Sequence, residues 1–447
     1  MKIHFIAIGG SAMHNLAIAL HLKGYEITGS DDEIFDPARS RLVKYGLLPA
    51  TIGWFPEKLD ATVDAVILGM HARADNPELL RAKDLNLKIY SYPEFLYEQS
   101  KNKTRIVVSG SHGKTTITSM ITHVLQQCGI DCDYMVGAQL AGFEVMVKLS
   151  NTASIIVIEG DEYLTSPIDR RPKFHLYQPT IGIISGIAWD HVNVFPTFDI
   201  YVQQFKIFAN MIPDYGRYIY CADDKVLAEM SKQVQCPHKY SYSIHPHHIV
   251  DGVTCLDSAS GMIKLQIFGK HNLANLNAAR LACEAVGINE AQFYQAIASF
   301  KGASKRLELV TKTDQCIVYK DFAHSPSKVK ATIAAVREQF PDYQLTACLE
   351  LHTFSSLSTD FLPEYAGVMD LSDEALVFFD PHALAHKKLP ALSIEQITTA
   401  FCCKNLEVFS NVNLLKNRLL QKHTQKRVLL FMSSGNFGNL NMERINA

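Results

Sequence analysis

Short apolar runs alternate along the whole chain with longer segments in which apolar residues recur every three or four positions. The short runs are typical of buried parallel strands, and the longer periodic segments are typical of helices that cover a sheet. Strands that alternate with helices in this way indicate an α/β fold. The predicted strands are 3–8, 25–29, 63–69, 89–90, 106–108, 154–158, 180–185, 218–221, 317–319, 345–349, 375–379 and 428–432.

The length of 447 residues is enough for roughly three domains. We predict three α/β domains in series: a Rossmann-like domain over 1–100, a central parallel-sheet domain with a phosphate loop over 101–300, and a second Rossmann-like domain over 301–447. The polar, basic segment 100–103 is the expected first linker. Lys301 and Gly302 follow a predicted helix and are expected to act as a hinge.

The clearest chemical signal lies between the predicted strand 106–108 and a predicted helix from Thr115 to Gln127. Small residues fill the loop between them, and Gly-Lys-Thr opens the helix. In a phosphate-binding loop the backbone N–H groups face the anion, the lysine adds a charge, and the hydroxyl holds Mg²⁺. The strict pattern requires a glycine where Val108 stands, but the shorter form keeps the phosphate-contacting part. The predicted nucleotide-phosphate residues are Gly110, Ser111, His112, Gly113, Lys114, Thr115 and Thr116.

Polar side chains follow the next two predicted strands. Glu159, Asp161 and Glu162 come after the strand 154–158, and Asp190 and His191 come after the strand 180–185. The carboxyl ends of strands are where α/β sheets bind ligands, and a carboxylate beside a phosphate loop can hold Mg²⁺. The histidine could be a metal ligand, an acid–base group or simply a satisfied core or surface residue.

The chain opens with a strand, the turn Gly9-Gly10-Ser11 and a helix, and Asp31 follows the second strand. A glycine turn at a helix N-terminus suits a diphosphate. The full GxGxxG motif is absent, so this opening is poor support for NAD. Farther along, His271 and Asn275 open a predicted helix, where they could cap it or read an adenine edge.

Composition narrows the class of function. The net charge of −2 and the pI near 6.8 argue against nucleic acid or an anionic membrane as the main partner. Neither a membrane-spanning run nor a signal peptide is recognisable, and the ten cysteines have no CxxC spacing. We therefore expect a cytoplasmic protein with reduced thiols and neither a zinc site nor a disulfide scaffold. Nothing in the sequence indicates the oligomeric state.

The order of these motifs resembles the Mur ligase family, which builds the peptide of bacterial cell-wall precursors, and the resemblance covers essentially the whole chain. SGSHGKTT resembles the family's GTHGKTT, and GKHNLANLNAA matches G-x-HN-x-x-N. EGDEY, the later Arg171, Lys173 and Phe174, and the segment Gly142-Phe143-Glu144 resemble most the branch that recycles a cell-wall tripeptide. LELHTFSS and MSSGNFG fall where that branch has LEPRSNT and MSNGGFG.

The resemblance implies an ATP- and Mg²⁺-dependent acid–amino-acid ligase. Its lactyl carboxylate substrate, UDP-N-acetylmuramate, would attack ATP, and the resulting acyl phosphate would react with the amine of L-alanyl-γ-D-glutamyl-meso-diaminopimelate. Lys114, Glu159 and His191 would be catalytic, with Thr115, Glu159 and His191 as metal ligands. The other implied contacts are His271 and Asn275 with adenine, Arg306 and Asp321 with ATP on domain closure, Gly9, Gly10, Ser11 and Asp31 with the uridine diphosphate, and His352 with the incoming peptide.

Several positions depart from the family pattern, and they leave the acceptor open. His352 replaces an arginine and Leu357 a lysine in a loop expected to face the peptide. Imidazole does not replace a bidentate guanidinium. The alternatives are a ligase for free L-alanine and a non-catalytic binder of UDP-sugar or ATP; a nicotinamide dehydrogenase rests only on the opening turn. Other departures are Leu164, Gly186, Asn193, Lys320 and Ser325, and Phe205 stands where some members carry a carbamylated lysine, so no carbamate is expected.

Overall fold

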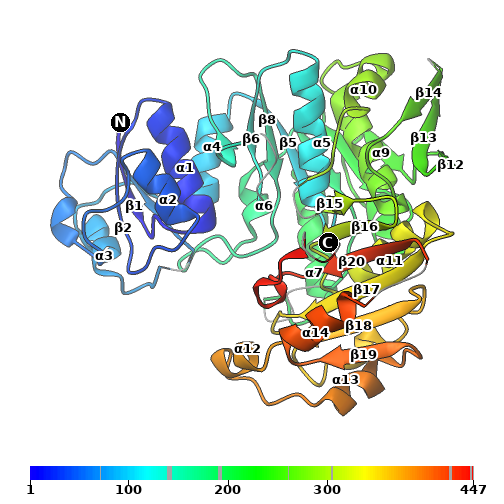
Figure 1. Ribbon diagram of the computed structural model, residues 1–447. Helices are drawn as coiled ribbons and strands as arrows, with labels where there is room; N and C mark the ends of the chain where they lie inside the picture. The colour runs from blue at the N-terminus through cyan, green and yellow to red at the C-terminus, as the bar shows by residue number, and fades with distance from the viewer. Residues whose placement is uncertain are drawn as a thin grey trace. The chain divides into compact units, whose positions relative to one another are not determined.

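The computed structural model describes residues 1–70, 72–137, 143–189, 194–259, 261–303, 306–421, 425–442 and 445 (Figure 1). It divides into two compact units. The first comprises Met1–Ile244 and Ala274–Ile297, and the second comprises His245–Leu273 and Ala298–Ala447. The predicted α/β class is confirmed, whereas the predicted domain boundaries at residues 100 and 300 stay predictions.

A four-stranded parallel sheet with the strand order β2-β1-β3-β4 forms the N-terminal part of the first unit. Its strands are the predicted ones to within a few residues, because apolar side chains fill both of its faces. The elements are β1 (Lys2–Ile6), α1 (Ser11–Leu22), β2 (Glu26–Ser30), α2 (Ala38–Lys44), η1 (Pro56–Lys58), β3 (Ala65–Leu68), α3 (Pro77–Asp84), β4 (Ile89–Ser91) and α4 (Tyr92–Ser100).

The rest of the first unit is built on a seven-stranded sheet with the order β11-β10-β9-β5-β8-β6-β7, parallel except for β7. The strand before the phosphate loop, β5, lies in the middle, with β8 and β9 as its neighbours. The elements are β5 (Thr104–Ser109), α5 (Lys114–Gln127), β6 (Cys132–Met135), β7 (Val147–Lys148), β8 (Ile155–Glu159), α6 (Lys173–Leu176), β9 (Ile181–Ile184), α7 (Phe198–Asn210), β10 (Arg217–Cys221), α8 (Lys225–Lys232), β11 (Lys239–Tyr242) and α10 (Glu290–Ile297).

A small antiparallel sheet that the sequence analysis did not predict opens the second unit. It consists of β12 (His248–Val250), β13 (Val253–Ser258) and β14 (Gly261–Lys264). Its outer strands are largely exposed, so they lack the apolar run that marks a buried strand. The helix α9 (Lys270–Glu284) follows; it begins in the second unit and ends in the first.

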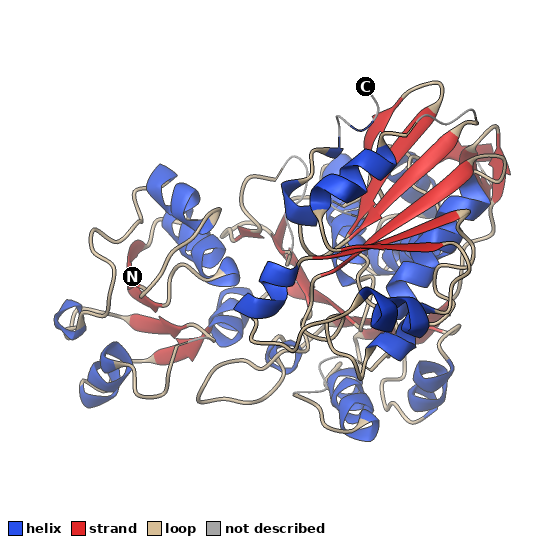
Figure 2. Cartoon of the chain, turned by 60° about the horizontal axis from the view of Figure 1, so that its bottom comes forward, coloured by secondary structure: helices blue, strands red, loops and turns tan. Residues whose placement is uncertain are grey.

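The remainder of the second unit is a six-stranded sheet with the order β15-β16-β20-β17-β18-β19, in which only β15 is antiparallel to its neighbour. One apolar cluster lies on each face, and helices flank the sheet (Figure 2). The elements are β15 (Glu308–Lys312), β16 (Cys316–Asp321), α11 (Pro326–Gln339), β17 (Gln344–Leu351), η2 (Leu362–Tyr365), β18 (Glu374–Phe379), α12 (Pro381–His386), α13 (Ile394–Phe401), β19 (Leu406–Phe409), α14 (Val412–Leu419), β20 (Arg427–Met432) and η3 (Phe437–Asn439).

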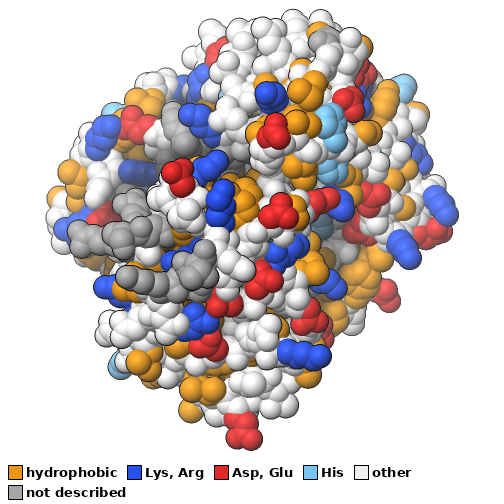
Figure 3. Space-filling view, turned by 45° about the vertical axis from the view of Figure 1, so that its right-hand side comes forward, with side chains coloured by type: hydrophobic (Ala, Val, Ile, Leu, Met, Phe, Trp, Pro, Cys, Tyr) orange, Lys and Arg blue, Asp and Glu red, His pale blue; other side chains and the backbone are white. Residues whose placement is uncertain are grey.

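Two further features are the distribution of charge on the surface and the character of the helices. Acidic and basic side chains of the described residues are interspersed over the face shown in Figure 3. Among the helices that the structure describes, none combines the length and the apolar character needed to cross a membrane.

Candidate active site

The loop between β5 and α5 has the backbone geometry of an anion-binding turn. Gly110 and Gly113 take φ values of +124° and +76°, which side-chain-bearing residues rarely adopt. A Cβ on Gly110 would collide with Ser185, and a Cβ on Gly113 would collide with the amide oxygen of Asn275. Because the N-cap residue Gly113 has no side chain to occupy the first N–H groups of α5, these groups can face an anion.

The side chain of Lys114 folds back over this loop. Its Nζ donates hydrogen bonds to the carbonyl oxygen of Gly110 at 2.6 Å and to Oε2 of Glu162 at 2.8 Å. Burial lowers the pKa of Lys114, but the carboxylates of Glu162, Asp161 and Glu159 outweigh burial and hold this pKa above its ordinary value. The ammonium group therefore stays charged at neutral pH, as a phosphate ligand requires.

Glu159, at the end of β8, lies beside the first turn of α5. Its Oε1 accepts a hydrogen bond from Oγ1 of Thr115 at 2.9 Å, and its Oε2 accepts one from the N–H of Gly137 at 2.8 Å. Burial raises the pKa of Glu159, against the opposing effects of Gly137, Lys114 and Thr115. A bound cation would favour the ionised form of such a carboxylate.

The oxygens of Thr115 and Glu159 are hard donors, which Mg²⁺ prefers, so the two residues fit this ion. Within the part of the chain that the structure describes, no three His, Cys, Asp or Glu side chains come together as a metal cluster. His191 lies outside the described residues, together with Asp190 and Asn193. Its roles as a metal ligand and as a catalytic residue stay predictions.

The turn after β9 packs directly on the phosphate loop. Oγ of Ser185 contacts the carbonyl oxygens of Ser109 and His112. A Cβ at Gly186 would lie 2.5 Å from Nε2 of His112, so the absence of a side chain there leaves room for this imidazole. The departure at Gly186 thus has a local steric reason in this chain.

The glycine turn at the start of α1 forms a second candidate anion site. The N–H of Gly9 donates to Oδ2 of Asp31 at 2.6 Å, and Gly10 precedes Ser11, the first residue of the helix. Burial raises the pKa of Asp31 to about 6, and the neighbouring Asp32 carboxylate adds to this effect. The turn therefore combines open helix N–H groups with a carboxylate that is partly protonated near pH 6.

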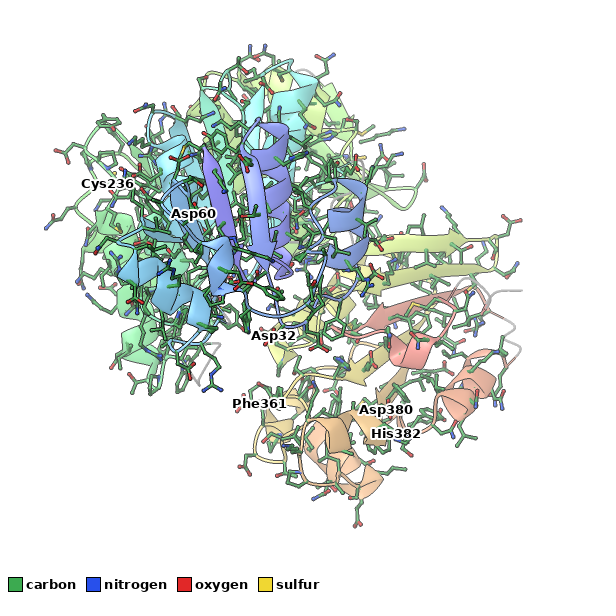
Figure 4. The ribbon with its side chains drawn as sticks, turned by 90° about the vertical axis from the view of Figure 1, so that its left-hand side faces the viewer. Asp32, Asp60, Cys236, Phe361, Asp380 and His382 are labelled. Carbon is green, nitrogen blue, oxygen red and sulfur yellow. The ribbon has the colours of Figure 1, made fainter. Side chains whose placement is uncertain are left out.

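A pocket of about 290 Å³ lies next to this turn. Asp32, labelled in Figure 4, lines it just beyond the end of β2. Trp54 also lines it, which was not predicted because an isolated tryptophan in a loop carries no motif. The lining residues are Ala7, Asp31, Asp32, Trp54, Ala72, Arg73, Asp75, Asn76 and Pro77.

In the second unit, Asp321 accepts hydrogen bonds from the N–H groups of Leu307 and Ala323, both at 2.7 Å. It therefore fixes the backbone beside Arg306, whose guanidinium lies 4.8 Å from the ring centre of Phe322. Burial lowers the pKa of His271, and the Asp321 carboxylate partly opposes this effect. Asn275 lies one turn farther along α9, in the first unit, where its side chain touches Gly113.

His352 and Leu357 have different environments, although one loop carries both. The side chain of His352 is partly exposed, with Nδ1 4.0 Å from Oε1 of the buried Glu350. Leu357 is 1% exposed and belongs to the apolar core of the second unit. The side chain of Leu357 is therefore enclosed by the core, and the expectation that this loop faces the incoming peptide stays a prediction.

The remaining departures have local partners. Leu164 forms an isolated bridge with Pro172, and Lys320 pairs with Glu308 at 2.9 Å on the adjacent strand. Ser325 is the N-cap residue of α11. Phe205, at the position of the carbamylated lysine, is fully buried and stacks on Phe174.

The chain is similar to known proteins along nearly its whole length. Three family models match the chain in series: the Mur ligase family catalytic domain over residues 2–104, the Mur ligase middle domain over 108–283 and the Mur ligase glutamate ligase domain over 305–435. A curated relative from Caldicellulosiruptor bescii, named UDP-N-acetylmuramate–L-alanine ligase, is 32% identical over 416 residues, which are 89% of this chain and 87% of that protein.

Two solved structures are also similar. The UDP-N-acetylmuramate–alanine ligase from Thermotoga maritima has a TM-score of 0.72 and 20% identity, covering 98% of this chain and 97% of that one. The UDP-N-acetylmuramate:L-alanyl-γ-D-glutamyl-meso-diaminopimelate ligase from Neisseria meningitidis has a TM-score of 0.61 and 26% identity, covering 67% of this chain and 98% of that one.

The fold, the phosphate loop and the relatives define the class of protein as an ATP-dependent, amide-bond-forming ligase. The chain belongs to the Mur ligase family. The family expectation from the sequence is therefore confirmed, and the chain is a ligase of peptidoglycan synthesis.

Proposed function

We propose that this ligase uses ATP and Mg²⁺ to activate the lactyl carboxylate of UDP-N-acetylmuramate and joins it to the amine of an amino acid or a short peptide. The observation that carries the proposal is the convergence of Lys114, Thr115 and Glu159 at the end of the central strand. This set places one cation and two hard oxygens beside an anion-binding turn. Such a set suits phosphoryl transfer from a nucleotide.

L-Alanine is the first candidate for the acceptor. The curated relative that is 32% identical is named as an L-alanine ligase, and it matches nearly the whole chain. This relationship favours free L-alanine over the tripeptide, the acceptor first expected from the sequence. A small acceptor is also compatible with His352 in place of an arginine, because alanine has only one carboxylate for the enzyme to bind, fewer than the tripeptide has.

The tripeptide remains the second candidate because of one segment, 159–174. It begins with Glu159 and is held by the Leu164–Pro172 bridge and by an ion pair of 2.9 Å between Asp161 and Lys173. Its residues EGDEY, Arg171, Lys173 and Phe174 resemble the tripeptide branch. The relative from Neisseria meningitidis, named for that tripeptide, is 26% identical over two thirds of the chain.

The roles of the remaining site residues belong to this proposal. Lys114 would bind the β- and γ-phosphates, while Thr115, Glu159 and His191 would hold Mg²⁺. The uridine diphosphate would lie at the start of α1, with its nucleoside in the pocket beside Trp54 and Asp32. His271 and Asn275 would contact adenine, Arg306 and Asp321 would reach ATP, and His352 would face the acceptor.

The chemistry follows from the substrates. The lactyl carboxylate attacks the γ-phosphorus of ATP, the bond to the β–γ bridging oxygen breaks, and ADP leaves. The acceptor amine then attacks the acyl phosphate, loses a proton, and expels inorganic phosphate as the amide forms. Mg²⁺ supplies charge neutralisation for the transferring group. Lys114 keeps its charge beside three carboxylates and can neutralise the same group.

The test is ADP release by the purified protein with ATP, Mg²⁺ and UDP-N-acetylmuramate, with L-alanine and the tripeptide supplied in parallel. Release with L-alanine alone supports the first candidate, and release with the tripeptide alone supports the second. Release with neither, together with intact ATP binding, indicates a non-catalytic binding protein. Lys114→Ala should lower turnover by about two orders of magnitude or more, and near-parental ligation would contradict the mechanism.

A further inference from the structure

Glu162 is a buried carboxylate for which the proposed reaction has no role so far. The residue is 1% exposed, and it lies on the loop after β8, three positions beyond Glu159. One of its oxygens, Oε2, accepts the hydrogen bond from Nζ of Lys114 at 2.8 Å. The other, Oε1, contacts the hydroxyl of Tyr201 on α7 at 3.3 Å.

The hydroxyl of Tyr201 continues this network back to the phosphate loop. It lies 2.9 Å from Oγ of Ser111, which in turn accepts the N–H of Ala188 at 2.9 Å. Lys114 links Glu162 back to the phosphate loop, because its Nζ also donates a hydrogen bond to the carbonyl oxygen of Gly110. Four hydrogen bonds and the peptide bond between Gly110 and Ser111 thus form a closed ring, which we call the loop circuit: Gly110, Ser111, Tyr201, Glu162 and Lys114.

The directions of the bonds in the loop circuit are fixed by chemistry. An ionised carboxylate only accepts, so Tyr201 donates its single proton to Glu162. Ser111 must then donate to the oxygen of Tyr201, and it still accepts from Ala188. An ammonium group has three protons, of which two point at Gly110 and Glu162. Among the residues that the structure describes, no third acceptor is recorded for this group, so the third proton can be given to a ligand of the loop.

We propose that Glu162 is a positioning residue that fixes the ammonium group of Lys114 for contact with the γ-phosphate of ATP. This inference rests on the proposed role of Lys114 in binding ATP. A lysine side chain has four rotatable bonds, and fixing it in advance removes an entropic cost from phosphate binding. A charge-assisted hydrogen bond in a buried setting is strong enough to select one such conformation. Tyr201 and Ser111 then tie that conformation to the backbone of the same loop.

The opposite role for such a pair is competition with the nucleotide. If Glu162 only neutralised Lys114 in the absence of nucleotide, ATP would have to displace it, and its removal would tighten ATP binding. The two roles therefore predict changes of opposite sign. The free third proton and the ring through Ser111 favour positioning, because both leave Lys114 directed at the loop while Glu162 stays bound.

The experiment measures binding of Mg·AMP-PNP, a non-hydrolysable ATP analogue, and of Mg·ADP by calorimetry. Glu162→Gln keeps the size of the side chain but removes its charge. We expect the affinity for AMP-PNP to fall about tenfold and the affinity for ADP to change less than about threefold, because the loss concerns the γ-phosphate. Glu162→Asp should recover part of the loss, since it restores the charge. Unchanged affinities, or tighter binding of AMP-PNP, would overturn the proposal.

Two further variants separate this proposal from simpler explanations. Asp133→Asn breaks another buried ion pair of the same unit, with Lys103, and should lower stability without changing the AMP-PNP to ADP ratio. If it changes that ratio as Glu162→Gln does, the effect is general loosening and the proposal fails. Lys114→Ala should abolish the preference for AMP-PNP. If Lys114→Ala instead binds both nucleotides normally, the proposed ATP site itself is wrong.

Discussion

The hydroxyl of Thr115 donates a 2.9 Å hydrogen bond to the carboxylate of Glu159, across 44 residues of sequence. Thr115 belongs to the first turn of α5, and Glu159 is the last residue of β8. Their elements meet because β8 pairs with β5, the strand that leads into the phosphate loop. Two hard oxygens are thereby held side by side at the carboxyl end of the sheet, which is where a metal–nucleotide complex is expected to bind.

Glu159→Gln should lower ADP release by about two orders of magnitude and raise the Mg²⁺ concentration needed for half-maximal activity. The reason is that a neutral amide oxygen binds a divalent cation more weakly than a carboxylate does. Titration of turnover with Mg²⁺ measures both effects. Thr115→Ser, which keeps the hydroxyl, is the matched control and should behave like the parent. A Gln variant with parental Mg²⁺ dependence would rule out Glu159 as a ligand.

Elements whose burial is visible in the sequence were predictable. The strands β5, β8 and β9 are continuous apolar runs, so their pattern alone placed the phosphate loop and Glu159 at neighbouring strand ends. The exposed strands of the small antiparallel sheet carry no such run and were missed. The ligase activity was predicted only from the resemblance to a known family, because neither the strand pattern nor the composition specifies a reaction.

Contacts that depend on how loops fold back were not predictable. The pairing of Glu162 with Lys114 needs the loop after β8 to turn toward the phosphate loop, and nothing in the residues EGDEY specifies that turn. Trp54 lines the pocket only because its loop folds beside Asp32. The burial of Leu357 likewise follows only from the way its loop folds onto the core of the second unit.

The carboxylate of Asp31 should make the stability of the chain depend on pH. Burial raises its pKa in the folded chain to about 6 from an ordinary value of 3.8. Between these pH values the folded chain holds a proton that the unfolded chain has released, so stability falls as pH rises through this window and stays lower above it. Asp31→Asn carries no charge and should therefore raise the unfolding temperature at pH 8 more than at pH 4.

Asp60→Asn serves as the control for this pH effect. Asp60, labelled in Figure 4, is exposed, and hydrogen bonds from Thr62 lower its pKa. Its replacement should therefore give no gain in stability above pH 6. Thermal unfolding of both variants at a series of pH values measures the difference. Equal gains for Asp31→Asn at pH 4 and pH 8 would show that Asp31 does not titrate in this window.

Gly113→Ala should destabilise the first unit and weaken nucleotide binding by tenfold or more. Two causes act together: the φ value of +76° strains an alanine by roughly 1–2 kcal/mol, and the new Cβ would collide with Asn275. Gly129→Ala separates the causes, because Gly129 has a φ value of +72° and open space around it. The Gly113→Ala, Asn275→Ala double variant should regain the part of the stability lost to the collision. Equal unfolding temperatures for Gly113→Ala and Gly129→Ala would remove the collision from this explanation.

Restoring the two family residues of the acceptor loop should have opposite consequences. Leu357→Lys places an ammonium group in the core of the second unit, where its desolvation should cost about 3 kcal/mol or more.

His352→Arg changes a partly exposed side chain and should leave stability within about 0.5 kcal/mol of the parent. Its guanidinium can bind a carboxylate in two places, so activity with the tripeptide should rise relative to activity with L-alanine. Unfolding temperature and ADP release with each acceptor measure the two effects, and Leu357→Met is the conservative control. A stable Leu357→Lys variant with increased tripeptide activity would mean that this loop opens to the acceptor and that the enclosed position of Leu357 is not the one used in catalysis.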